Sequence, residues 1–319
     1  MKIFDENGKI LLTPASIAYI HQLLLAEPAI TGIANMTRPE IQEWGSTALH
    51  FAATAIETGE SLLVKVNVPQ DQLWWTRELT KNCPELLPHV YATGTQLAGI
   101  PLGWTVWERV FSGLNPGWQG REFEMLLEAD VKFQQAAKCL EQSAREAGVL
   151  HELNIEEVSR DLERGMSRRP PGPAARVIER LGQDWHWVTT VCEFEVCHGD
   201  LHMANALCRS IPPDGEALLI DYHPVRMPWA IEPAKPEILN ADPSRVGCRD
   251  LIIKQGHIRT KHGMSSPKAD DLKRLQTIVL GWSAIHMWGY IGSNPDPLWR
   301  THTIWRDENE AYIAAAAQA

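Results

Sequence analysis

Apolar side chains in the N-terminal part of the chain change from helical spacing to strand spacing. Residues 15–26 place apolar groups three and four positions apart, which predicts an amphipathic helix. Residues 48–56 and 61–66 are extended apolar runs separated by the polar segment 57–60. This pattern predicts two strands joined by a turn.

The next segments predict a helix and then two more strands. Residues 72–81 have a helical pattern that ends before Cys83-Pro84, because proline does not continue a helix. Residues 90–94 and 104–110 are strand-like, and a turn with two glycines and a proline lies between them at 99–103.

The C-terminal part is mainly helical in pattern. Helices are predicted over 120–147, 154–166 and 174–181, with a proline-rich loop at 168–173. Residues 276–289 predict a further, buried helix.

Between these helices lies a short strand followed by a proline-rich segment. The apolar run 217–220 predicts a buried strand that ends at Asp221. Four prolines within 222–237 exclude a long helix and predict a loop.

The composition is that of an ordinary globular protein of one or two domains. The chain has 319 residues, 44% hydrophobic and 22% charged, with a net charge of -10. This charge argues against general binding to nucleic acid. No apolar run is long enough for a membrane span, and the N-terminus lacks the apolar core of a secretory signal, so we expect a soluble cytoplasmic protein.

The six cysteines are scattered without a C-x-x-C pair, which favours reduced thiols over disulfides or a zinc site. Cys192 and Cys197 with His198 are an alternative metal-binding set, but their spacing matches no structural zinc pattern.

The strongest chemical signal is the segment His198-Gly199-Asp200-Leu201-His202 with Asn205. Asn205 follows Asp200 by five positions, as in the kinase catalytic loop H-R-D-L-x-x-x-N, and Asp221 ends the next strand. Phosphoryl transfer to a hydroxyl needs a carboxylate near the incoming oxygen, and carboxylate and amide oxygens to hold Mg²⁺. Taken singly, His198 is equally typical of a buried histidine, Asp200 of a turn and Asn205 of a helix cap.

Lys65 lies in the apolar run Leu62-Leu63-Val64-Lys65-Val66, where an unpaired ammonium group is costly. Glu78, in the middle of the predicted helix 72–81, is the expected ion-pair partner. The alternatives are an edge-strand lysine that reaches solvent and a solvated glutamate.

Two further segments fit a nucleotide. The small residues Gly45, Ser46 and Thr47 would let backbone N–H groups approach phosphates, although a single glycine is also typical of a hairpin turn. The strand that closes at Glu108 to Val110 would form a hinge whose backbone bonds an adenine edge.

The segment after Asp221 is open to two interpretations. Trp229, Glu232 and Glu237 either line an acceptor pocket or serve in packing. Residues 249–274 contain seven Lys or Arg against three Asp, and predict either a solvated face or recognition of an acidic group.

With lysine, helix glutamate, hinge, catalytic loop and metal aspartate in kinase order, the chain resembles the aminoglycoside phosphotransferase family of protein-kinase-like small-molecule kinases. The resemblance covers about residues 40–240 and is most specific at His198 to His202, Asn205 and Ile220-Asp221. Gly199, where protein kinases usually carry arginine, favours this family over protein kinases.

The resemblance implies an α+β, two-lobed, protein-kinase-like fold. A small antiparallel-sheet lobe over 1–110 would bind the nucleotide and end in the hinge, and a larger, mainly helical lobe over 111–319 would carry catalysis and substrate binding. ATP would bind between the lobes, and a small-molecule hydroxyl would accept the phosphoryl group.

By the same resemblance, Asp200 is the catalytic aspartate on a loop built with His198 and His202, and Asn205 and Asp221 bind Mg²⁺. Lys65 contacts the nucleotide phosphates, and Glu78 positions Lys65.

The family resemblance leaves the acceptor open. Antibiotic inactivation is the preferred role, and kinases of choline, other amino alcohols or sugars are alternatives. Tyr222-His223 stands where many members carry another acid or Gly-Asp-Pro. A catalytically silent nucleotide-binding module is a rival of another class, and a protein kinase is disfavoured because D-F-G and A-P-E signatures are missing.

Overall fold

The computed structural model describes residues 4, 13–37, 48–110, 112–113, 120–167, 172–210, 214–240, 247–291 and 303–319. Internal contacts divide the chain into two units, Met1–Phe111 and Ser112–Ala319. Each unit has its own hydrophobic core.

The first unit is built on a five-stranded antiparallel sheet. Its strand order is β1 (Ile33–Ala34), β2 (Leu49–Ala55), β3 (Ser61–Val66), β5 (Trp104–Glu108) and β4 (Val90–Gly94). The short 3₁₀ helices η1 (Pro28–Ile30) and η2 (Pro84–Leu86) connect these elements. The predicted hairpin and the two later strands are confirmed.

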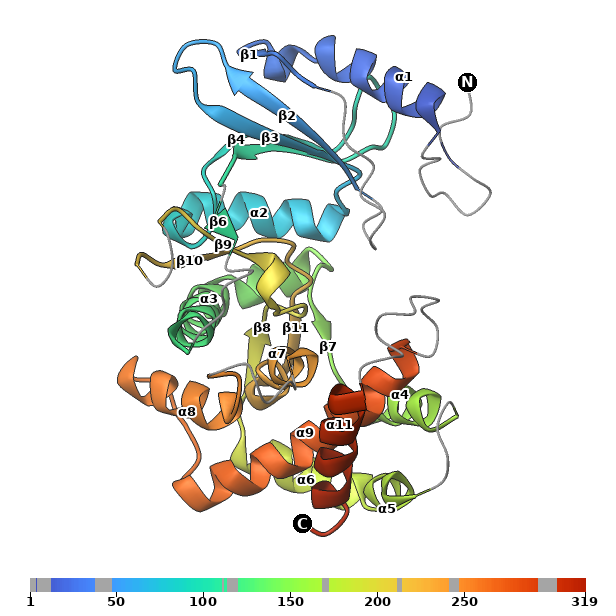
Figure 1. Ribbon diagram of the computed structural model, residues 1–319. Coiled ribbons are helices and arrows are strands. Elements are labelled where there is room, and N and C mark those ends of the chain that lie inside the picture. The colour runs from blue at the N-terminus through green and yellow to red at the C-terminus, as the bar shows by residue number, and fades with distance from the viewer. Residues whose placement is uncertain are drawn as a thin grey trace. The chain divides into compact units, whose positions relative to one another are not determined.

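Helices α1 (Pro14–Leu25) and α2 (Gln70–Asn82) cover opposite faces of this sheet (Figure 1). Because side chains alternate along a strand, Leu62, Val64 and Val66 of β3 join the core beneath α1, whereas Lys65 points toward α2. The sheet therefore buries Lys65 on the face that α2 covers.

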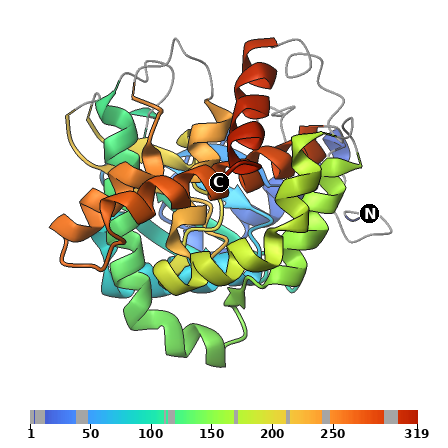
Figure 2. The same ribbon diagram turned by 90° about the horizontal axis from the view of Figure 1, so that it is seen from below.

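The second unit is mainly helical. Its helices are α3 (Arg121–Glu146), α4 (Ile155–Met166), α5 (Pro173–Glu179), α6 (Leu181–Val191), α7 (Ala234–Leu239), α8 (Leu251–Lys261), α9 (Ala269–Ile291) and α11 (Thr303–Ala316). The apolar helix α9 contacts α4, α7, α8 and α11, and Figure 2 shows α11 in red lying across α9 in orange.

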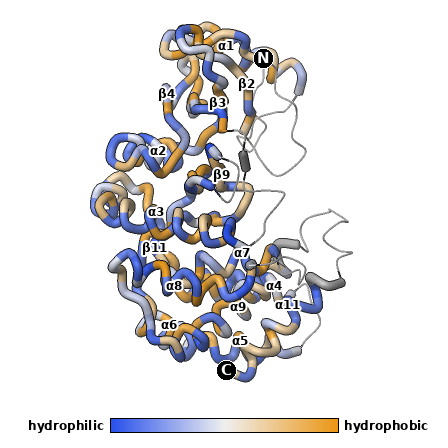
Figure 3. The backbone as a smooth tube through the Cα atoms, turned by 60° about the vertical axis from the view of Figure 1, so that its left-hand side comes forward, coloured by the Kyte–Doolittle hydropathy of each residue, from blue (hydrophilic) through white to orange (hydrophobic). Residues whose placement is uncertain are grey.

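Two small sheets complete this unit. One has the order β10 (Ala217–Leu219), β9 (Ala206–Cys208) and β6 (Ser112–Gly113), and the other β7 (His151–Glu152), β11 (Val225–Pro228) and β8 (Phe194–Cys197). The 3₁₀ helices η3 (Met203–Asn205) and η4 (Trp229–Ile231) follow His202 and β11. Hydrophobic stretches, orange in Figure 3, mark the strands of the first unit and parts of the helices of the second.

The expectation of a loop over 222–237 was wrong. The segment holds β11, η4 and α7, because its prolines occupy positions that tolerate them. Pro228 ends a strand, and Pro236 lies in the first turn of α7, where a missing N–H breaks no helical hydrogen bond.

Candidate functional site

The catalytic-loop segment begins where β8 ends, and its backbone requires glycine. Gly199 has a φ of 84°, and a Cβ placed there would overlap the carbonyl of His223. Glycine alone accepts both conditions without strain. The sequence motif therefore has a local structural cause at this position.

Glu232 fixes this loop from beneath. Its Oε2 accepts a hydrogen bond from the Gly199 N–H at 2.9 Å, and its Oε1 accepts one from the Leu201 N–H at 2.8 Å. The side chain is 3% exposed. Burial raises the pKa of Glu232, although both N–H groups oppose this shift. The two amides hold the carboxylate on either side of Asp200, so Glu232 positions the loop, and it also lines a cavity beside that loop.

Three side chains contact the carboxylate of Asp200. Asn205 Nδ2 donates to Asp200 Oδ2 and to the Asp200 carbonyl, each at 2.9 Å, and His202 Nε2 lies 3.4 Å from Oδ2. Lys235 Nζ forms an ion pair with Oδ1. Burial by itself raises the pKa of Asp200, but the hydrogen bond with His202 and the charge of Lys235 outweigh it and lower the pKa well below its ordinary value. Asp200 is therefore ionised at neutral pH, and its side chain is 30% exposed.

Lys235 had not been singled out in the sequence. It lies in α7, 35 residues after Asp200. Lys235 lies between Pro233 and Pro236, and no sequence motif there indicates an ion pair with Asp200.

His198 connects the loop to the strand that precedes Asp221. Its Nδ1 accepts from the Asp200 N–H at 3.3 Å, and its Nε2 donates to the Ile220 carbonyl at 2.9 Å. The ring packs against Phe133 and Tyr222. Burial lowers the pKa of His198 to about 4, so the ring is neutral at pH 7. His202 uses its ring nitrogens in the same way. Its Nδ1 accepts a hydrogen bond from the Ala204 N–H, and its Nε2 faces Asp200.

Asn205 and Asp221 have the chemistry of a magnesium site. The Ile220 N–H donates to the Asn205 carbonyl at 3.0 Å, which links the two segments next to Asp221. Both side-chain hydrogen bonds of Asn205 use Nδ2, so its Oδ1 is left as a ligand atom. One amide oxygen and one carboxylate fit Mg²⁺, which takes few protein ligands when phosphates supply others.

The alternative metal set of Cys192, Cys197 and His198 was wrong. Within the described ranges, no group of three or more His, Cys, Asp or Glu is arranged to hold a metal ion. Both thiols are buried, and burial raises the pKa of Cys192 to about 12.

In the first unit, Lys65 is 6% exposed and donates to Gln72 Oε1 of α2 at 3.4 Å. The expected ion pair with Glu78 was wrong, because Glu78 contacts Asn82, one turn further along α2. Gln72, about two turns closer to the start of the helix, contacts Lys65.

The hinge segment has its own partners. The Glu108 N–H donates to the His89 carbonyl at 2.8 Å, and Glu108 Oε2 accepts from the His89 N–H at 3.1 Å. Val110 lies two positions after the end of this strand. Gly45, Ser46 and Thr47 lie outside the described residues.

Trp229 and Glu237 are interior residues, which corrects their expected place in an acceptor pocket. Trp229 is fully buried beneath the guanidinium of Arg259, 4.8 Å from its ring centre. Glu237 accepts hydrogen bonds from the Leu251 N–H at 2.8 Å and the Tyr312 hydroxyl at 3.1 Å. Burial raises the pKa of Glu237 to about 7.

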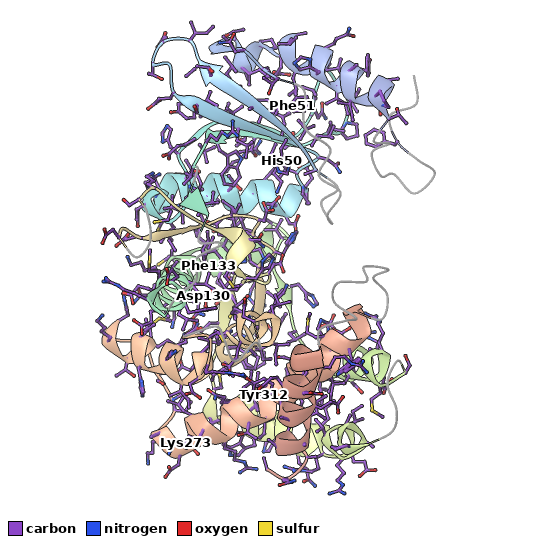
Figure 4. The ribbon with its side chains drawn as sticks, in the orientation of Figure 1. His50, Phe51, Asp130, Phe133, Lys273 and Tyr312 are labelled. Carbon is purple, nitrogen blue, oxygen red and sulfur yellow. The ribbon has the colours of Figure 1, made fainter. Side chains whose placement is uncertain are left out.

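The basic segment 249–274 includes one residue of the buried core. Arg259 has no exposed surface, pairs with Glu195 at 3.0 Å and donates to the Ser265 carbonyl. It also bonds Gln134, whose neighbour one turn earlier on α3 is the buried Asp130 (Figure 4). This arginine therefore stabilises the interior and is not available to an acidic ligand.

No protein-family model matches the sequence, and no curated protein matches it significantly. Solved structures do match in fold. An aminoglycoside phosphotransferase from Alicyclobacillus acidocaldarius is 11% identical, with a TM-score of 0.56 over 98% of both chains. A spectinomycin phosphotransferase with bound ADP and spectinomycin is 12% identical, with a TM-score of 0.55 over 96% of this chain and 99% of that chain. An ethanolamine kinase from Plasmodium vivax is 11% identical, with a TM-score of 0.51 over 97% of this chain and 90% of that chain.

These similarities establish the fold class. The chain has the protein-kinase-like fold of aminoglycoside phosphotransferases and related small-molecule kinases, as the sequence motifs predicted. In the part of the chain that the structure describes, no helix is long and apolar enough to cross a membrane.

Proposed function

We propose that this protein is an ATP- and Mg²⁺-dependent phosphotransferase that acts on a hydroxyl group of a small molecule. The observation that carries the proposal is the environment of Asp200. This carboxylate is ionised and partly exposed, and it is fixed by Asn205, His202 and Lys235 on a loop that Glu232 holds. A structural carboxylate would need no such loop, whereas a kinase aspartate that orients a hydroxyl does.

In the proposed reaction the acceptor oxygen forms a bond to the γ-phosphorus while the bond from that phosphorus to the β,γ-bridging oxygen breaks, and ADP leaves. Asp200 orients the hydroxyl and accepts its proton as the new bond forms. The low pKa of Asp200 makes it a weak base, so its main contribution is orientation with late proton transfer. Lys235 keeps the carboxylate in place and offsets its charge beside the anionic phosphates.

We propose Lys65 as the phosphate contact, oriented by Gln72, and the backbone from Glu108 to Val110 as the adenine contact. Asn205 and Asp221 would hold Mg²⁺, which neutralises charge on the phosphates when bound.

We infer an antibiotic as the acceptor, with a metabolite alcohol as the alternative. Structures of similar fold include phosphotransferases named for aminoglycosides and spectinomycin and one named for ethanolamine, which supports both classes.

The test is Mg²⁺-ATP consumption with mass detection of the product, run against aminoglycosides, spectinomycin, other antibiotics with free hydroxyls and amino alcohols. Asp200→Asn serves as the blank. A product heavier by one phosphoryl group that is missing with the variant establishes the reaction. Nucleotide binding without any product across the panel would contradict it and favour a silent binding module.

A further inference from the structure

A cavity of about 270 Å³ lies beside the catalytic loop in the second unit. Its walls come from α4, β11, η4 and α9, together with the segment before α4. The lining is mainly apolar and includes Leu153, Val158, Leu162, Val225, Met227, Ile231, Val279, Trp282 and Met287. Gly199 and Lys235 form the edge nearest to Asp200, because Lys235 also pairs with that carboxylate.

The carboxylates at this cavity are already engaged. Asp161 lies 3.2 Å from Arg164 and 3.5 Å from His286, and the hydrogen bond with His286 lowers the pKa of Asp161. Both oxygens of Glu232 accept backbone N–H groups of the catalytic loop. A polycationic acceptor needs several carboxylates that are free to pair with its amines, and these walls do not offer them.

The cavity volume also restricts the acceptor. Pockets for drug-sized ligands span about 300–1,000 Å³, so this one is suited to a single compact body. Burial against the apolar walls would supply most of the affinity, and the polar ring of His286 would orient the molecule.

We propose that this cavity is the acceptor site and that the acceptor is a compact alcohol with an apolar body. Its body lies between α4 and α9, and its hydroxyl points past Gly199 and Lys235 toward Asp200. This inference rests on the proposed phosphotransferase function for its meaning, but the cavity can be tested without any turnover.

The experiment measures binding of phenylalkanols to the nucleotide-free full chain by isothermal titration calorimetry. The probes are benzyl alcohol, 2-phenylethanol and 3-phenylpropanol, with kanamycin as the polycationic comparison. We expect the Kd to fall about threefold to fourfold with each added methylene group, as burial of a CH₂ predicts. Any binding of kanamycin should be unaffected by the substitutions in the cavity that are described next.

Ser283→Trp is the variant that fills the cavity, and Ser283→Ala is its matched control. The tryptophan should weaken 3-phenylpropanol binding at least tenfold, whereas alanine should leave it within twofold. Leu153→Trp enters from a different wall and replaces Ser283→Trp if that protein does not fold by circular dichroism. Phenylalkanol binding that neither tryptophan weakens, or kanamycin binding that both abolish, would overturn the proposal.

Mg²⁺-ATP turnover of the same proteins separates the two claims. Binding in the cavity without phosphorylation of any alcohol would keep the ligand site and contradict the phosphotransferase. Phosphorylation of some acceptor that Ser283→Trp and Leu153→Trp leave unchanged would keep the phosphotransferase and contradict this acceptor site.

Discussion

Asp200 is the side chain on which the proposed chemistry depends. Asp200→Asn keeps the shape of the residue but removes the charge and the proton acceptor. We expect kcat to fall by at least about a hundredfold, the lower end of what a positioned acid or base contributes, with nucleotide affinity unchanged within threefold. Steady-state phosphotransfer and nucleotide titration measure the two effects. A variant that retains more than a tenth of wild-type kcat would contradict this role.

Lys235 acts through Asp200, and a double-mutant cycle can show this. Lys235→Ala should lower kcat at least tenfold, while the double variant with Asp200→Asn should be no slower than Asp200→Asn alone, because the lysine then has no carboxylate to hold. Lys132→Ala is the matched control, since Lys132 forms an exposed ion pair with Glu216 and should leave kcat unchanged. If the losses of kcat from the two single substitutions multiplied in the double variant, Lys235 would not act through Asp200.

Individual residues were predictable where the motif is local. Asp200 and Asn205 lie on one loop and Asp221 lies two residues after β10, so their spacing along the chain, read as a kinase motif, already indicated their proximity. Glu232, Lys235 and Gln72 reach their partners through tertiary packing, which no spacing encodes. Glu232 was a candidate for the acceptor pocket, but the sequence does not show that its carboxylate also accepts backbone N–H groups of the catalytic loop.

At the scale of elements, Glu237 joins α7 to the start of α8 and to α11. Its pKa is raised from 4.5 to about 7 in the folded chain, so folding favours the protonated form. The stability that this provides is present below pH 4.5 and is lost as the pH rises through about 7. Glu237→Gln keeps an acceptor for Leu251 and a donor for the Tyr312 oxygen, and has no charge to lose.

We therefore expect the free energy of unfolding of Glu237→Gln to exceed that of the wild type at pH 8 by as much as about 3 kcal/mol, at about 1.4 kcal/mol per pKa unit. The difference should disappear near pH 4.5. Urea unfolding at several pH values measures it. A difference in the free energy of unfolding that stays constant over this pH range would show that folding does not raise the pKa of Glu237.

Elements with long, regular patterns were predictable, and short ones were not. The helices α1 to α4 and α9 and the hairpin of β2 and β3 have enough apolar positions to define a period. Helices α6 and α11 and the small elements β11 and α7 were missed. Strand β11 has four residues and is set by pairing with β8 and β7, and α7 contains a proline, so tertiary contacts decide both.

At the scale of the whole molecule, the chain has two hydrophobic cores, one in each unit. The core of the first unit surrounds the sheet that carries Lys65, and the core of the second packs α4 and α9 behind the catalytic loop. The sequence indicated the sheet of the first unit and the helices of the second. It did not indicate the proposed acceptor cavity, because the residues that line the cavity are scattered from Leu153 to Met287 and meet only after folding.

If Lys65 and Asp221 contribute to nucleotide binding in different ways, ligand-induced stabilisation should separate them. A ligand that binds only the folded chain raises its melting temperature by mass action. In the wild type, ADP should raise the melting temperature and added Mg²⁺ should raise it further. Lys65→Ala should lose most of the rise with ADP alone, because it removes a phosphate contact.

Asp221→Asn should keep the rise with ADP and lose the increment from Mg²⁺, because a neutral amide replaces the charged metal ligand. Asparagine also tolerates the φ of 60° at this position, so the backbone is not strained by the change. Glu78→Ala is the control within the nucleotide unit, since Glu78 contacts Asn82 and not Lys65, and it should respond to both ligands like the wild type. Differential scanning fluorimetry measures all four proteins with and without Mg²⁺. An Mg²⁺ increment that Asp221→Asn retains would contradict the metal assignment, and a Glu78→Ala protein that loses the rise with ADP, as Lys65→Ala does, would contradict the revised partner of Lys65.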